Sequence, residues 1–73
     1  MVHISQKISR LKSIRNGFIF RPVFDSHGVS PLMMYVRLRS SSNGDILCVE
    51  ESWDTTPIYL PSDLLVRRVI ETE

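Results

Sequence analysis

The sequence of 73 residues has a single cysteine, three glycines and no long apolar run. Because Cys48 stands alone, an intramolecular disulfide is excluded, and a buried thiol in a reducing compartment is expected. The apolar runs fall far short of the roughly 20 residues that a membrane-spanning helix needs. The first residues also lack the apolar stretch of a secretory signal. These absences predict a soluble, cytoplasmic protein.

Groups suited to catalysis or metal binding are scarce as well. The two histidines, His3 and His27, belong to no nucleophile signature such as G-x-S-x-G. Together with Cys48 they are too few and too dispersed for a zinc site, and isolated glycines make no phosphate-binding loop. Glu50 and Glu51 are adjacent, but consecutive strand residues point to opposite faces of a sheet. The sequence therefore predicts a non-enzymatic protein with no metal and no cofactor.

Charge is divided along the chain, although the net charge is only +1. Residues 1–40 contain seven Lys or Arg and one Asp, whereas residues 41–73 contain two Arg and seven Asp or Glu. This asymmetry indicates either a basic face for an acidic partner or two halves that interleave and neutralise each other on folding. The sequence leaves both interpretations open.

The first segment has the apolar spacing of a helix. Its apolar residues recur at steps of four, three and three: Ile4, Ile8, Leu11 and Ile14. Ser5 is a suitable N-cap and Gly17 a suitable C-terminal residue. The β-branched isoleucines lower helix propensity, so the helix is expected to be short. We predict an amphipathic helix over residues 6–15 with a basic outer face.

The rest of the chain is rich in aromatic and β-branched residues, as strands are. Pro22 cannot donate to a β-ladder, so its strand is expected at a sheet edge or at a bulge. A turn is predicted over residues 25–28, Asn43-Gly44 predicts a hairpin, and residues 61–63 predict one helical turn. The expected strands are residues 18–24, 33–39, 46–50, 58–60 and 66–70. The fold class predicted for this single domain, residues 1–73, is α+β: one short helix with an antiparallel sheet of four or five strands.

Basic residues are the main candidates for partner binding. Trp53 joins them as either a lid on a thin core or an exposed anchor for a protein partner. The predicted partner-binding residues are Lys7, Arg10, Lys12, Arg15, Arg21, Arg37, Arg39 and Trp53. Arginines near Phe20 and Tyr35 also suit phosphates and stacked bases, which makes a nucleic-acid-binding module the alternative. A pI near 8.0 is lower than such a module usually has.

Two resemblances extend these expectations. The succession of strands, Asn43-Gly44 turn and single turn between Pro31 and Val69 resembles a small SH3-like barrel. The whole chain, in its length and lack of catalytic groups, is similar to the small host-takeover proteins of lytic phages, in particular transcription regulators of Xanthomonas phages. That resemblance implies a cytoplasmic protein of the infected bacterium that binds the β and β′ subunits of host RNA polymerase. It also implies σ displacement, which blocks initiation, and antitermination. We expect a monomer that acts by protein-protein interaction, with nucleic acid secondary and no membrane partner.

Overall fold

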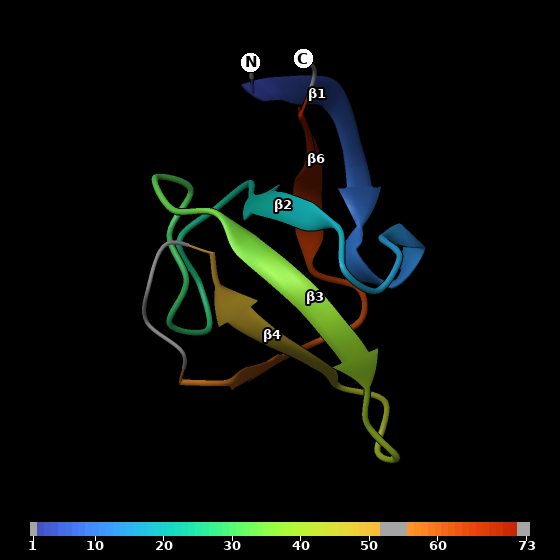
Figure 1. Cartoon of the computed structure of the whole chain (residues 1–73). Helices are drawn as coiled ribbons and strands as arrows, with labels where there is room; N and C mark the ends of the chain where they lie inside the picture. The colour runs from blue at the N-terminus through green and yellow to red at the C-terminus, as the bar shows by residue number, and fades with distance from the viewer. Residues whose placement is uncertain (1, 52–55, 72–73) are drawn as a thin grey trace.

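The computed structural model describes the backbone of residues 2–51 and 56–71 and the side chains of residues 7–51 and 56–70. Within these residues six strands form one antiparallel sheet in the order β1-β6-β2-β3-β4-β5 (Figure 1). The elements are β1 (Val2–Arg10), a 3-10 turn η1 (Leu11–Ser13), β2 (Ile19–Pro22), β3 (Tyr35–Ser40), β4 (Ile46–Glu50), β5 (Ile58–Leu60) and β6 (Leu65–Glu71). The fold is therefore nearly all β, and the predicted α+β class is wrong.

The predicted N-terminal helix is replaced by a strand. β1 pairs with β6 from Val2 opposite Glu71 to Arg10 opposite Leu65, with an irregularity between Ile4 and Ile8. Figure 1 shows β1 bending sharply along its length. β-Branched isoleucines favour extended backbone, and pairing with β6 at the other end of the chain outweighs the local helical spacing. The cations of this segment consequently lie on a strand, a 3-10 turn and a loop, and not on a basic helix face.

The core is formed mainly by residues of β2, β3, β4, β5 and β6 together with Leu11 of η1 and Ile14 directly after it. It contains Leu11, Ile14, Phe20, Val29, Tyr35, Ile46, Cys48, Leu60 and Val66. Phe20 and Tyr35 are register partners in β2 and β3, and their ring centroids are 6.0 Å apart. The amide of Leu11 donates to the carbonyl of Leu64 at 2.8 Å, which joins η1 to the turn before β6. Leu11 and Ile14, two residues of the predicted helical stripe, are thus buried, but they lie in and after a 3-10 turn and not on a helix.

β2 lies inside the sheet, between β6 and β3, and not at the predicted edge. Pro22 is tolerated there because the register between β2 and β3 covers only Ile19 and Phe20. The amide of Val23 donates to Leu65 of β6, so by strand alternation the nitrogen of Pro22 faces the opposite side, beyond the end of the β3 ladder. The missing N–H therefore breaks no bond of that ladder.

Turns lie at the three predicted positions, but residues 61–63 form a simple turn and not the predicted helical turn. Ser41 and Asp45 close the β3–β4 hairpin around Asn43-Gly44, and Gly44 has φ +91°. His27 and Gly28 both have positive φ in the turn that bridges Ser26 and Val29. That turn lies within a long connection from β2 to β3. The turn predicted at residues 61–63 is closed by a hydrogen bond from the Leu64 amide to the Pro61 carbonyl.

The second half of the chain does not form the expected SH3-like barrel by itself. β3, β4 and β5 make a meander, but β6 leaves it and pairs with β1 and β2. Strands from the first half are therefore needed to hold β6, and the two halves share one sheet. In the part of the chain that the structure describes, no helix is long and apolar enough to cross a membrane.

Candidate partner-binding surface

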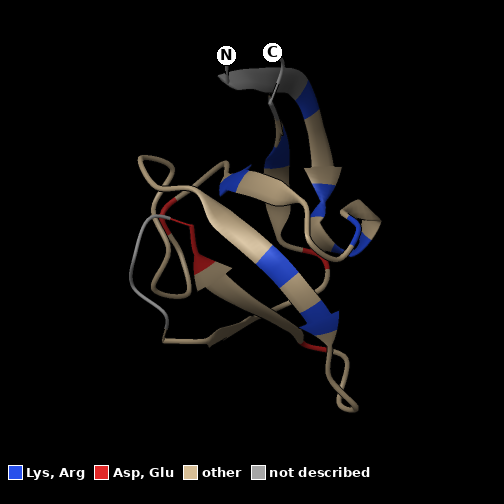
Figure 2. Cartoon of the chain, viewed as in Figure 1, with Lys and Arg blue, Asp and Glu red and all other residues tan. Residues whose placement is uncertain are grey.

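Cations are concentrated on the three adjacent strands β1, β6 and β2. Their described side chains include the cations Lys7, Arg10, Arg21, Arg67 and Arg68 and no carboxylate; the side chain of Glu71, which ends β6, lies outside the described set. The neighbouring η1 adds Lys12, and the loop after it adds Arg15. Figure 2 shows Lys and Arg positions on β1, β2 and β6 and around η1, with two more on β3. Folding therefore gathers much of the positive charge on and beside these three strands.

The described carboxylates occupy different places. Asp25, Asp45, Glu51 and Asp63 lie in turns or connections, and Glu50 ends β4 (Figure 2). Asp63 is the one nearest in sequence to β6. The two halves thus share one sheet without placing a carboxylate among the described side chains of β1, β6 and β2.

Arg21 and Arg67 are directly opposite each other in the β2–β6 ladder. Opposed residues of an antiparallel pair lie on the same face of a sheet, and a like-charge pair in that position is destabilising. Among the described residues, Nε of Arg21 is buried without a hydrogen-bond partner. The neighbouring register pair places Ile8 opposite Arg67. One row of the sheet therefore reads Ile8, Arg67, Arg21 across three strands.

The next register pair, Arg10 opposite Leu65, lies on the same face because Leu65 is two residues from Arg67 in β6. This face is directed away from the core, since the alternating residues Phe20, Pro22 and Val66 are buried. Ile8 is 46 % exposed and Leu65 is 40 % exposed. We call the surface made by Ile8, Arg10, Arg21, Leu65 and Arg67 the arginine face.

An aliphatic row adjoins the arginine face. It runs across four strands through consecutive register pairs: Val69, Ile19, Val36 and Val49. Val69 is buried, whereas the other three side chains are partly exposed. Arginines and aliphatic side chains therefore alternate over one continuous side of the sheet.

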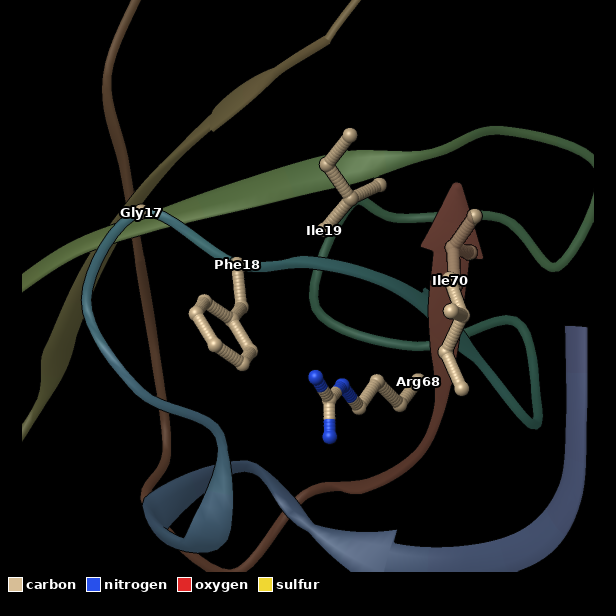
Figure 3. A pocket seen from close by; sticks show the side chains of 6 residues that line it. Gly17, Phe18, Ile19, Arg68 and Ile70 are labelled. Atoms are coloured by element: carbon tan, nitrogen blue, oxygen red, sulfur yellow. The ribbon is translucent and has the colours of Figure 1, made fainter. Parts of the chain in front are cut away.

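A second feature is an open hollow of about 220 Å³ beside the β2–β6 pair, lined by Gly17, Phe18, Ile19, Arg68, Val69 and Ile70. The guanidinium carbon of Arg68 lies 4.5 Å from the centre of the Phe18 ring. In Figure 3 the Phe18 and Arg68 side chains extend toward each other, and the Ile19 side chain points away from them. The hollow thus offers one cation and one aromatic ring to a ligand.

Arg37 holds the η1 segment in place. Its guanidinium donates to the carbonyls of Leu11, Lys12 and Ile14 at 3.2, 3.1 and 2.5 Å. It also donates to Oδ1 of Asn16 at 3.0 Å and to Oγ of Ser40 at 2.8 Å. The donors of this arginine are therefore engaged within the chain, which gives it a structural task.

Cys48 is a fully buried free thiol at the centre of β4. Burial raises its pKa from 9.0 to about 12, and the charge of Arg37 opposes part of that rise. The thiol is therefore protonated at neutral pH and shielded from reagents. No group of three His, Cys, Asp or Glu side chains that could hold a metal ion occurs among the described residues.

The structure places the predicted binding residues in different environments. Lys7, Arg10, Lys12, Arg15 and Arg39 are exposed, and Arg21 is partly buried in the arginine face. Arg39 lies apart from that face, at the far end of β3 opposite Leu47. Trp53 falls outside the described residues, so its two interpretations stay open.

Sequence reasoning missed the two consecutive arginines of β6. Arg67 and Arg68 were counted with the acidic half of the chain, yet the structure inserts β6 between the basic strands β1 and β2. The signal was present in the alternation of residues 65–70, which puts Leu65, Arg67 and Val69 on one face and Val66, Arg68 and Ile70 on the other.

The sequence matches no protein-family model. No match to a curated protein or to a solved structure reaches significance.

Proposed function

We propose that this protein is a non-enzymatic regulator that acts by binding a negatively charged surface of a larger protein. The observation that supports the proposal is the basic surface on β1, β6 and β2, whose described side chains include cations and no carboxylate. Such a surface speeds the encounter with an acidic partner and orients the complex. The exposed aliphatic side chains beside the arginines provide area whose burial adds affinity.

Host RNA polymerase is the partner proposed first. The similarity to phage-encoded transcription regulators implies contacts with its β and β′ subunits, σ displacement and antitermination. A small domain that covers part of a polymerase surface needs no catalytic group for these effects. The mechanism proposed is occupation of a surface that σ would otherwise use.

The test is direct binding of the purified chain to purified bacterial RNA polymerase core enzyme at about 150 mM salt, where exposed charges are screened beyond about 8 Å. Saturable binding to the core enzyme and release of σ from the holoenzyme are expected. Absence of binding to the core enzyme would overturn the polymerase proposal. Binding with retention of σ would contradict the displacement mechanism.

A nucleic-acid-binding module is the second candidate, supported by the Phe18–Arg68 hollow. An aromatic ring beside a guanidinium is the combination on which single-stranded bases and phosphates are held. Binding of this kind falls steeply with salt, with a log-log slope near −0.7 for each phosphate neutralised on a single strand. Micromolar binding of a short single-stranded oligonucleotide at about 150 mM salt, together with no polymerase binding, would make this candidate the better one.

A further inference from the structure

We propose that the arginine face is the docking surface for an acidic amphipathic helix of a protein partner. This inference rests on the proposed function, because it specifies which side of the sheet is used and which segment of the partner fits it. The surface is made by Ile8, Arg10, Arg21, Leu65 and Arg67 on β1, β6 and β2. The occupant presents carboxylates and aliphatic side chains together.

The charge of the face calls for carboxylates. Arg10, Arg21 and Arg67 are the ionisable residues that the register places on it, and two of them are directly opposed. The repulsion between Arg21 and Arg67 lowers the stability of the unbound protein. A carboxylate placed between two guanidinium groups removes that repulsion and accepts charge-assisted hydrogen bonds from both.

The apolar part of the face favours protein over nucleic acid. Ile8 and Leu65 are 46 % and 40 % exposed and lie in the same two register rows as the arginines. Exposed aliphatic side chains gain from burial against other aliphatic groups, whereas bases are held by stacking on aromatic rings. The aromatic ring of Phe18, the residue before β2, contacts Arg68, whose side chain points to the face opposite Arg67 because the two are consecutive in β6 (Figure 3).

Geometry favours a helix over an added strand. β6 lies between β1 and β2 and pairs with both, so a partner reaches the centre of this face through side chains alone. Three neighbouring strands span about 10 Å, because adjacent strands lie about 4.8 Å apart. A helix with its side chains has a diameter of about 10–12 Å. One amphipathic helix therefore covers β1, β6 and β2 together.

The experiment is an amide chemical-shift titration of the 15N-labelled chain with a synthetic helical peptide of about five turns. The peptide carries a leucine stripe flanked by glutamates. We expect the largest shifts at Ile8, Arg21, Leu65 and Arg67. Controls are a scrambled peptide of equal composition and a short thymidine oligonucleotide, each expected to shift these amides much less.

Two charge reversals complete the test. Arg67→Glu is expected to weaken peptide binding by about tenfold or more, because an acidic side chain then meets the acidic peptide. Arg15→Glu makes the same charge change in the exposed loop after η1 and is expected to weaken binding by less than about threefold. Equal effects of the two substitutions would overturn the docking site, since only net charge would then matter.

Three further outcomes would also overturn the docking site. The oligonucleotide could cause larger shifts than the peptide, or the shifts could be confined to Phe18 and Arg68. The amides of the arginine face could also shift when the protein concentration alone is raised. The last result would assign the face to self-association. The assay contains no polymerase, so peptide binding without polymerase binding rejects only that partner. If Arg67→Glu leaves the affinity for polymerase unchanged, only the arginine face is ruled out as the binding site.

Discussion

Arg67 of β6 stands directly opposite Arg21 of β2, so two guanidinium groups share one face of adjacent strands. Its neighbour Arg68 points to the other side and lies over the ring of Phe18 at 4.5 Å. The same strand thus holds one arginine, Arg67, that lowers the stability of the fold and one, Arg68, that raises it. This difference between consecutive residues allows stability and binding to be separated by experiment.

Replacing each of these arginines by glutamate should change stability in opposite directions. Arg67→Glu converts a like-charge pair into an opposite-charge pair and is expected to raise the free energy of unfolding by about 0.2–1 kcal/mol. Arg68→Glu removes the cation-π contact and is expected to lower it by about 0.5–1 kcal/mol. Urea denaturation of the wild type and both variants at low salt measures the effect. Equal shifts of the same sign would show that the register assigned to β6 is wrong.

Arg37→Lys should destabilise the chain. Nη1 of Arg37 donates to the carbonyls of Leu11, Lys12 and Ile14, while Nε and Nη2 donate to Asn16 and Ser40. A single ammonium group cannot replace three nitrogens at different positions, and hydrogen bonds to charged groups contribute about 1.5–3 kcal/mol each. We expect the midpoint of thermal unfolding to fall by about 5–15 °C for a domain of this size. Arg39→Lys on the same strand is the control and should leave the midpoint nearly unchanged. Equal midpoints for both variants would argue against the structural task given to Arg37.

Leu11→Ala and Ile8→Ala separate the observed fold from the predicted helix. A helical stripe would bury both residues, whereas the structure buries Leu11 completely and leaves Ile8 46 % exposed. Leu11→Ala is expected to cost about 2–5 kcal/mol and Ile8→Ala less than about 1 kcal/mol. Chemical denaturation of the two variants decides between the alternatives. Similar losses would favour the helix.

Cys48 should make the stability of the chain depend on alkaline pH. The pKa of the thiol is raised in the folded state from 9.0 to about 12, so the folded state retains a proton that the unfolded state loses. The associated stabilisation is complete below about pH 9 and is lost as the pH rises toward 12. Over this range wild-type stability should fall more steeply than that of Cys48→Ala, by up to about 1.4 kcal/mol per pH unit. Identical slopes would contradict the raised pKa.

The thiol also gives a test of burial at neutral pH. Iodoacetamide should leave Cys48 of the native chain unmodified and alkylate it once guanidinium chloride unfolds the protein, because only an exposed thiolate reacts. Mass spectrometry after timed quenching measures both rates. Rapid alkylation of the native chain would show that the centre of β4 opens readily.

Local sequence signals predicted the turns and most strands, and they failed where a distant strand decides the structure. Asn43-Gly44 needs only its own backbone preferences to form a hairpin turn, and Gly44 has the positive φ expected. The segment before Leu11 has a helical apolar spacing as well as β-branched residues. Its conformation is decided by pairing with β6, at the other end of the chain. No local pattern contains that information.

The basic character of the candidate surface was predictable from the sequence, but the set of residues that forms it was not. Arg10 and Arg21 stood out as cations, and the structure places both on the arginine face. Arg67 was assigned to the acidic half because only the sheet order brings β6 between β1 and β2. Arg37 shows the reverse case, since a cation expected to bind a partner is engaged by backbone carbonyls within its own chain.

The most direct test of the central claim is the affinity of purified RNA polymerase core enzyme for the wild type, Arg67→Glu and Arg15→Glu, measured by biolayer interferometry at about 150 mM salt. Unfolding of each variant is measured in parallel. The account predicts that Arg67→Glu is at least as stable as the wild type yet binds about tenfold more weakly, while Arg15→Glu binds within about threefold of the wild type. Undiminished binding by Arg67→Glu, or no binding by the wild type, would contradict it.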